Sequence, residues 1–159
     1  SMIAECALTA NYLGISLEKI KFAASEVKAV AHRLELLYNG DDVIIDDAYN
    51  GNEAGAQNAL EVLSKFSPRI RVLITPGIVE LGEHGEAANA RIGELAAVSC
   101  DYAIFVGGNA SALARGAKSA GMNVDNVTEV RDLDGAVEKL KTIKGEKAVL
   151  FENDLPDNY

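Results

Sequence analysis

The sequence predicts an α/β fold: a Rossmann-like, doubly wound and mostly parallel sheet with an antiparallel hairpin at its start. Strand-like and helix-like runs alternate along most of the chain, which is typical of parallel strands joined by right-handed crossovers. Apolar runs such as 103–106 show no polar alternation, as expected of strands covered on both faces. Asn39-Gly40 separates the first two runs and predicts a tight hairpin turn, since both residues tolerate positive φ.

Each element follows from a local pattern. Residues 1–27 predict two helices, the first ending near Gly14 and the second capped by Ser16. Apolar residues in 53–66 recur with a helical period, which indicates one buried face. The expected strands are 33–38, 42–46, 70–75, 102–106, 127–130 and 147–151, and the expected helices that follow the hairpin are 53–66, 84–99, 110–120 and 133–143.

Length and composition fit one globular core. The chain has 159 residues, of which 48% are hydrophobic and 25% charged. No stretch reaches the roughly 20 apolar residues of a membrane helix. The first residues lack the basic and apolar regions of a secretory signal, so we expect a cytoplasmic protein with no membrane partner. Cys6 and Cys100 lie in apolar surroundings and are expected to be buried free thiols.

The charge balance argues against nucleic acid as a partner. Lys and Arg number 15 and Asp and Glu number 24, which gives a net charge of −9. No run of basic residues interrupts this acidic excess. Neutralisation of phosphates supplies most of the affinity of nucleic-acid-binding domains, and this chain shows no basic face for it.

The motifs exclude several self-contained catalytic sites. The stretch 108–119 has the wrong spacing for a phosphate-binding P-loop, and 107–109 lacks the third glycine of a dinucleotide fingerprint. Cys and His are not spaced as zinc ligands, so we expect no metal site in this chain. His32 and His84 are isolated from each other and receive no assignment.

Asp46-Asp47 carries the richest chemistry at the carboxyl end of a predicted strand, where α/β sheets bind ligands. Three interpretations are open: acids that cap a helix, a magnesium-binding acid pair as in receiver domains, and a carboxylate that binds ribose hydroxyls. The receiver scheme also needs an Asp and a Lys at later strand ends, where 75–77 and 106–108 stand instead. The following turn, 49–52, favours ribose recognition, because its tyrosine can flank a base and its first asparagine can pair with an amide-like edge.

Three segments carry a family resemblance. Residues 45–52 resemble the Asp-Asp-Ser-Tyr-Asn-Ala-Asn signature of the MurF branch of the Mur ligases, which add amino acids to the peptidoglycan precursor. Residues 31–35 resemble the Pro-(Gly/His)-Arg-x-Glu segment that opens the carboxy-terminal domain of that family, and 80–83 match the end of its Gly-Asp-Met-x-Glu-Leu-Gly segment. The resemblance implies a Mur ligase carboxy-terminal domain over 29–159, preceded by terminal helices of the central ATPase domain over 1–28.

The resemblance implies an ATP-dependent amide ligase that acts on a UDP-linked muramyl peptide. ATP phosphorylates a carboxylate, and an amine then displaces the phosphate. By motif position, Arg33 is the catalytic residue that faces the ATP phosphates, and Asp47 holds the ribose hydroxyls. Tyr49 and Asn50 line the nucleotide pocket, whereas Glu80 fixes its loop. ATP and magnesium are bound mainly by the central domain, so we expect the 159-residue chain alone to be inactive.

Two departures from the family pattern leave the amine acceptor open. Residues 75–78 replace the family's Gly-Asp-Met, and the acidic stretch 151–159 replaces a Lys-Gly-Ser-Arg segment. Glu152, Asp154 and Asp157 would repel an acceptor's carboxylate, which disfavours D-Ala-D-Ala. Two alternatives are a folylpolyglutamate-type ligase, which usually carries Asp-(Gly/Tyr)-Ala-His-Asn-Pro at this place, and a non-catalytic nucleotide-binding α/β module.

Overall fold

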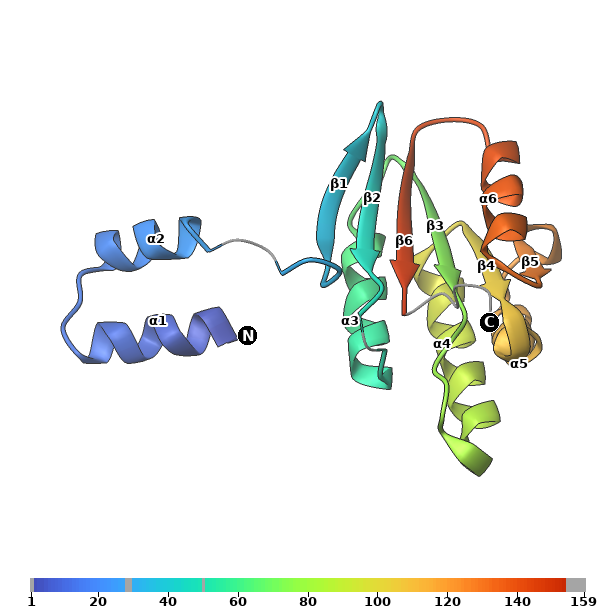
Figure 1. The fold of residues 1–159 in the computed structure, drawn as a ribbon, viewed down its shortest axis with the longest axis horizontal. Coiled ribbons are helices and arrows are strands. Elements are labelled where there is room, and N and C mark those ends of the chain that lie inside the picture. The colour runs from blue at the N-terminus through green and yellow to red at the C-terminus, as the bar shows by residue number, and fades with distance from the viewer. Residues whose placement is uncertain (1, 28–29, 50, 154–159) are drawn as a thin grey trace.

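A computed structural model of the chain describes residues 2–27, 30–49 and 51–153. Two parts are visible in Figure 1: a helical hairpin at the N-terminal end and an α/β domain that stands apart from it. The hairpin consists of α1 (Met2–Tyr12) and α2 (Leu17–Ser25). The α/β domain begins with β1 (Glu35–Asn39), and its described part extends to residue 153.

Six strands form one sheet in the described part of the α/β domain. After β1 come β2 (Asp42–Asp47), β3 (Ile70–Thr75), β4 (Tyr102–Val106), β5 (Val127–Val130) and β6 (Lys147–Glu152). Their spatial order is β1-β2-β6-β3-β4-β5. β1 pairs antiparallel with β2, and the other neighbours pair in parallel. The predicted fold class, including the antiparallel hairpin at Asn39-Gly40, is confirmed.

Helices cover both faces of this sheet. The helices are α3 (Glu53–Ser64), α4 (Gly85–Ser99), α5 (Ala110–Ser119) and α6 (Leu133–Thr142). Leu73 belongs to an apolar cluster with α3, α4 and α5, whereas its neighbour Ile74 belongs to a second cluster with α6. Successive strand residues point to opposite faces, and both of these side chains are fully buried. The apolar runs in the sequence therefore reflect a sheet buried on two sides.

The α4 and α5 backbones touch each other at two glycines. A Cβ atom built on Gly93 would lie 2.0 Å from the Leu113 carbonyl oxygen, and one built on Gly116 would lie 1.9 Å from the Ala90 carbonyl oxygen. Any other residue at either position would force the helices apart, because the opposing atom is backbone and cannot rotate away. These helices are held closer than side chains would permit.

The helical hairpin has no core of its own. Ser16 caps α2 as predicted, since its hydroxyl accepts a hydrogen bond from the Lys19 N–H. None of the residues 3–27 is buried, and Cys6 is exposed, so the prediction of two buried thiols holds for Cys100 and is wrong for Cys6. Two short helices packed only on each other cannot enclose a thiol.

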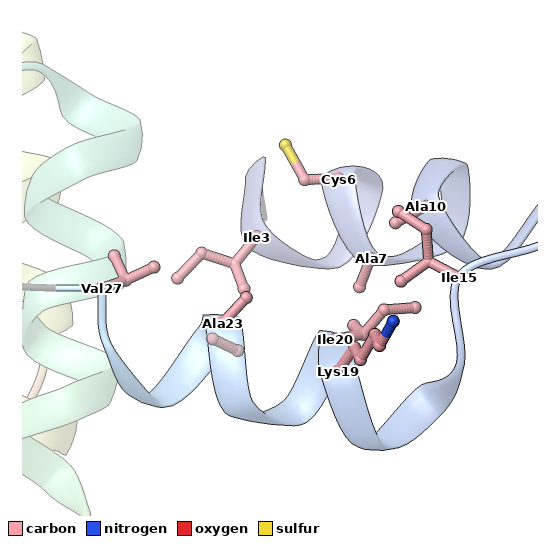
Figure 2. A pocket seen from close by; sticks show the side chains of 10 residues that line it. Ile3, Cys6, Ala7, Ala10, Ile15, Lys19, Ile20, Ala23 and Val27 are labelled. Atoms are coloured by element: carbon pink, nitrogen blue, oxygen red, sulfur yellow. The ribbon is translucent and has the colours of Figure 1, made fainter. Parts of the chain in front are cut away.

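An apolar groove runs between the two helices of the hairpin. Its volume is about 300 Å³, and Figure 2 shows Ile3 and Ala7 of α1 facing Ile20 and Ala23 of α2 across it. Lys19 is the charged side chain at its wall. Among the described residues, no helix is long and apolar enough to cross a membrane. The hairpin thus presents apolar surface.

β1 begins later than predicted, because it follows a connecting segment, residues 30–34, that is not a strand. His32 and Leu34 have positive φ values of 60° and 50°, which a strand cannot continue through. The strand therefore starts at Glu35 rather than at Arg33. The segment is tied to the far end of β2 instead, because the Tyr49 N–H donates to the His32 carbonyl oxygen at 3.1 Å.

Candidate functional site

Polar side chains from distant parts of the chain meet at the carboxyl edge of the sheet. They surround a cavity of about 230 Å³ next to the ends of β2 and β6. Three of the four residues predicted from the sequence line it, namely Arg33, Asp47 and Tyr49. Asn50, the fourth, lies outside the described residues. The cavity is also lined by Leu34, Gly51, Asn52, Gly55, Asn58 and Glu152.

Arg33 and Tyr49 form a cationic wall of this cavity. The Arg33 guanidinium carbon lies 4.7 Å from the centre of the Tyr49 ring, within the range of a cation–π interaction. Both side chains are exposed, and the Tyr49 side chain is 58% exposed. The guanidinium therefore lies over one face of the ring, and the positive charge and the ring are exposed together, which suits a ligand that carries phosphates and a base.

Asp47 is half-buried at the end of β2, and it holds the connecting segment in place. Its Oδ1 accepts a hydrogen bond from the Leu34 N–H at 3.0 Å. Burial raises the pKa of Asp47, the Leu34 hydrogen bond opposes that rise, Asp46 adds to it and Arg33 again opposes it. The helix-capping interpretation is wrong for Asp47, because Asn52 is the N-cap of α3 and accepts from the Gly55 N–H.

Glu152 lines this site but was not among the candidate site residues of the sequence analysis. The sequence assigns it only to the acidic stretch 151–159, whereas in the structure it is 2% exposed and its Oε2 accepts a 2.5 Å hydrogen bond from the Thr75 hydroxyl. Burial, with a smaller contribution from Asp47, raises the pKa of Glu152 to about 7, against the lowering effect of Thr75. The signal was available in the strand pattern, since Glu152 shares its face with the buried Leu150.

The loop after β3 is held rigidly beside the cavity. The Gly77 N–H donates to the Thr75 hydroxyl oxygen at 2.9 Å. Asn89 of α4 is fully buried; its Oδ1 accepts from the Ile78 N–H at 2.8 Å, and its Nδ2 donates to the Ile78 carbonyl oxygen at 3.0 Å. Asn89 has no sequence signal of its own, because an asparagine inside a helix is ordinarily a surface residue. This loop occupies the place of the family's Gly-Asp-Met segment.

The other polar residues that the sequence analysis discussed, His32, Glu80 and His84, do not line the cavity. The His32 Nδ1 is 2.8 Å from the Asp46 Oδ2, which fastens the connecting segment a second time to β2. Glu80 has a positive φ of 64° and is exposed, and it does not line the cavity. His84 is exposed in a short 3-10 helix before α4. Within the described ranges, no three His, Cys, Asp or Glu side chains are placed to hold a metal ion.

Comparisons with known proteins relate this chain to one family of ligases. A family model described as "Mur ligase, glutamate ligase domain" matches residues 32–152. The UDP-N-acetylmuramoyl-tripeptide--D-alanyl-D-alanine ligase of Buchnera aphidicola subsp. Acyrthosiphon pisum is 34% identical over 100 residues, which cover 62% of this chain and 22% of that protein.

Solved structures give the same picture. A crystal structure of MurF from Acinetobacter baumannii has a TM-score of 0.76 and 26% identity, covering 91% of this chain and 32% of that one. MurF ligase from Thermotoga maritima in complex with ADP has a TM-score of 0.67 at 20% identity, covering 92% and 32%. Folylpolyglutamate synthase from Thermotoga maritima has a TM-score of 0.54 at 18% identity, covering 91% and 33%. The last two similarities show the fold alone, and the chain spans no more than a third of these relatives.

Proposed function

This chain belongs to the Mur ligase family, and we propose that it is the carboxy-terminal domain of a MurF-like, ATP-dependent amide ligase of peptidoglycan precursor synthesis. The family resemblance inferred from the sequence is thereby confirmed. The observation that carries the proposal is the meeting of Arg33, Asp47 and Tyr49 around one cavity at the carboxyl edge of the sheet. These are the positions at which the family motifs place nucleotide contacts.

We assign residues 1–28 to the end of the central domain and 29–159 to the carboxy-terminal domain. The family model begins at residue 32, which lies beyond the hairpin. The hairpin has no buried residue among 3–27, which suits two helices that pack on a further domain. The chain spans 32% of an Acinetobacter baumannii MurF while 91% of it is matched there. On this assignment the 159-residue chain does not ligate or hydrolyse ATP alone.

In the proposed reaction, ATP phosphorylates a carboxylate of a UDP-linked muramyl peptide, and the incoming amine displaces phosphate from the acyl phosphate to form an amide. The Arg33 guanidinium faces the phosphates and offsets charge that develops during phosphoryl transfer. Asp47 accepts hydrogen bonds from the ribose hydroxyls with the oxygen that does not hold Leu34. Tyr49 lies against the base, and Asn50 is assigned to the same pocket. ATP and magnesium are assigned mainly to the central domain, so no step is assigned to a metal held by this chain.

Asp47 provides the test of this site in the full-length protein. Asp47→Ala is expected to raise the KM for ATP roughly tenfold or more, since a hydrogen bond to a charged group contributes about 1.5–3 kcal/mol. Asp47→Asn keeps an acceptor for the Leu34 N–H and removes the charge, which separates ribose binding from the structural contact. Asp41→Ala, an exposed acid at the opposite end of β2, is the control. Unchanged kinetics in Asp47→Ala at all ATP concentrations would contradict the proposed nucleotide contact.

The acceptor is proposed to carry less negative charge than D-Ala-D-Ala at the end opposite its amine. A zwitterionic dipeptide needs a cationic partner for its carboxylate. Glu152 lies at this carboxyl edge of the sheet beside Asp47, and in its ionised form it would repel an acceptor carboxylate that approaches the edge. Asp154 and Asp157 lie outside the described residues. We expect phosphate release by the full-length enzyme to be slow with D-Ala-D-Ala and faster with uncharged or amidated acceptors. Efficient turnover of D-Ala-D-Ala would contradict this proposal and would mean that the enzyme uses D-Ala-D-Ala as its acceptor.

A further inference from the structure

Asn153 links three strand ends at the carboxyl edge of the sheet. Its backbone N–H donates to the Asp47 carbonyl oxygen at 3.1 Å. Its side-chain Oδ1 accepts from the Gly51 N–H at 2.9 Å, and its Nδ2 donates to the Gly77 carbonyl oxygen at 2.5 Å. The residue is 5% exposed. One buried side chain after β6 therefore connects the loop that follows β2 with the loop that follows β3.

The chemistry of these contacts selects asparagine. The φ of Asn153 is 63°, in the left-handed region that Gly and Asn adopt most readily. Its amide supplies one acceptor to the Gly51 N–H and one donor to the Gly77 carbonyl oxygen. An aspartate would supply only the acceptor and would set a carboxylate oxygen against the Gly77 carbonyl. A glycine would keep the backbone conformation and supply neither contact.

The two loops joined by Asn153 differ in how else they are held. The loop containing Gly77 is buried and is fixed by Thr75 and Asn89. The loop containing Gly51 is half-exposed and borders the cavity. A Cβ atom on Gly51 would lie 2.6 Å from the Cγ of Asn153, so the side chain rests directly on the backbone of this loop. Asn153 thus transmits the rigidity of the buried loop to the exposed one.

We propose that Asn153 is a positioning residue for the nucleotide: it fixes the backbone of the loop after β2, so that Tyr49 and Asp47 are already placed before ATP binds. The inference rests on the proposed nucleotide site. A loop that is ordered in advance does not lose conformational freedom on binding, which strengthens binding without adding a contact. Loss of Asn153 should therefore raise the KM for ATP more than it lowers kcat.

The test uses the full-length protein with Asn153→Gly, which removes the side chain and tolerates the left-handed backbone. We expect the KM for ATP to rise about tenfold, from the loss of two hydrogen bonds, with kcat changed less than twofold. Hydrogen exchange of the amides in 51–56 should become faster. Asn123→Gly, an exposed asparagine whose side chain caps a turn before β5, is the matched control and should change neither.

A substitution of Gly51 tests the same contact between Gly51 and Asn153. Gly51→Ala should raise the KM for ATP, because its Cβ would displace the Asn153 side chain. In an Asn153→Gly background the three nearest atoms to that Cβ are gone, so Gly51→Ala should have no further effect. Such non-additivity is the signature of two residues that act through one contact.

The outcomes separate this inference from the proposed function. If the wild-type enzyme uses ATP and Asn153→Gly leaves its KM unchanged, the positioning role is refuted, even if amide exchange in 51–56 accelerates. If amide hydrogen exchange in 51–56 also stays unchanged, Asn153 does not fix the backbone of this loop. If the wild-type protein neither binds nor uses ATP, the proposed function fails and the nucleotide role of Asn153 fails with it. The supporting result is a raised KM, faster exchange and loss of the Gly51→Ala effect in the double variant.

Discussion

The helical hairpin exposes large apolar side chains, whereas the α/β domain buries them in its core. In the hairpin, Leu8 is 70% exposed and Phe22 is 68% exposed. In the domain, Phe105 and Leu113 are fully buried, and the buried apolar residues of the described chain all lie at Val43 or later. Both parts carry helices with apolar residues. A periodic pattern therefore predicts that a helix has an apolar face, and it does not predict whether the covering surface belongs to the same stretch of chain.

The largest expected difference between the two parts comes from a matched pair of substitutions. Phe105→Ala should lower the free energy of unfolding of the 159-residue chain by about 3–5 kcal/mol, because it opens a cavity in the sheet. Phe22→Ala, at an exposed position, should change it by less than about 0.5 kcal/mol. Urea unfolding followed by circular dichroism measures both. Equal losses would mean that the hairpin packs on the domain in solution.

A second, smaller difference concerns pH, through the buried carboxyl of Glu152. Its pKa in the folded state is raised from 4.5 to about 7 by burial, so the folded state binds the proton more tightly than the unfolded state. Its contribution to stability is complete below pH 4.5 and is lost as pH rises towards 7. Glu152→Gln, which stays neutral, should therefore be more stable than wild type at pH 8, by on the order of 2 kcal/mol, and should lose that advantage by about pH 4.

The control for this titration lies in the hairpin. Glu18→Gln replaces an exposed carboxyl on α2, outside the α/β domain, and should change the free energy of unfolding by less than about 0.5 kcal/mol. The measurement is the midpoint of urea unfolding across this pH range for wild type and both variants. If Glu152→Gln were less stable than wild type at pH 8, the carboxylate would be better paired than its surroundings indicate.

The smallest expected effect is that of removing the hairpin altogether. Deletion of residues 1–29 should change the free energy of unfolding of the α/β domain by less than about 1 kcal/mol, because none of residues 3–27 is buried. Deletion of 1–39 is the contrast, since it also removes β1, which pairs with β2 along its whole length. Thermal unfolding of the two shortened chains measures both effects. A large loss of stability on deletion of residues 1–29 would contradict the independence of the two parts.

Local patterns were sufficient to predict the sheet. Asn39-Gly40 marked the hairpin turn, and uninterrupted apolar runs such as 103–106 marked strands covered on both faces. The start of β1 was missed by two residues, because positive φ at Leu34 leaves no trace in a strand-like run of letters. The exposure of Cys6 was missed for another reason, since burial depends on what lies opposite and not on the apolar neighbours in sequence.

The site was predictable in part. Arg33, Asp47 and Tyr49 were named from motifs, and the structure brings them around one cavity. The sequence assigned Glu152 and Asn153 only to the acidic stretch 151–159, although they contact residues more than 75 positions away. Such contacts depend on parallel crossovers that bring strand ends together. No window of neighbouring residues shows which strand ends meet. Strand alternation could have predicted only that Glu152 points to the buried face of β6.

The glycine contacts between α4 and α5 have a mechanical consequence. Gly93 and Gly116 bring two backbones together with no flexible side chain between them, so neither helix can slide or rotate past the other without a clash of carbonyl oxygens. Because Asn89 fastens the loop after β3 to α4, the helix pair and that loop form a single lever. Any displacement of α4 therefore carries α5 and the loop after β3 with it.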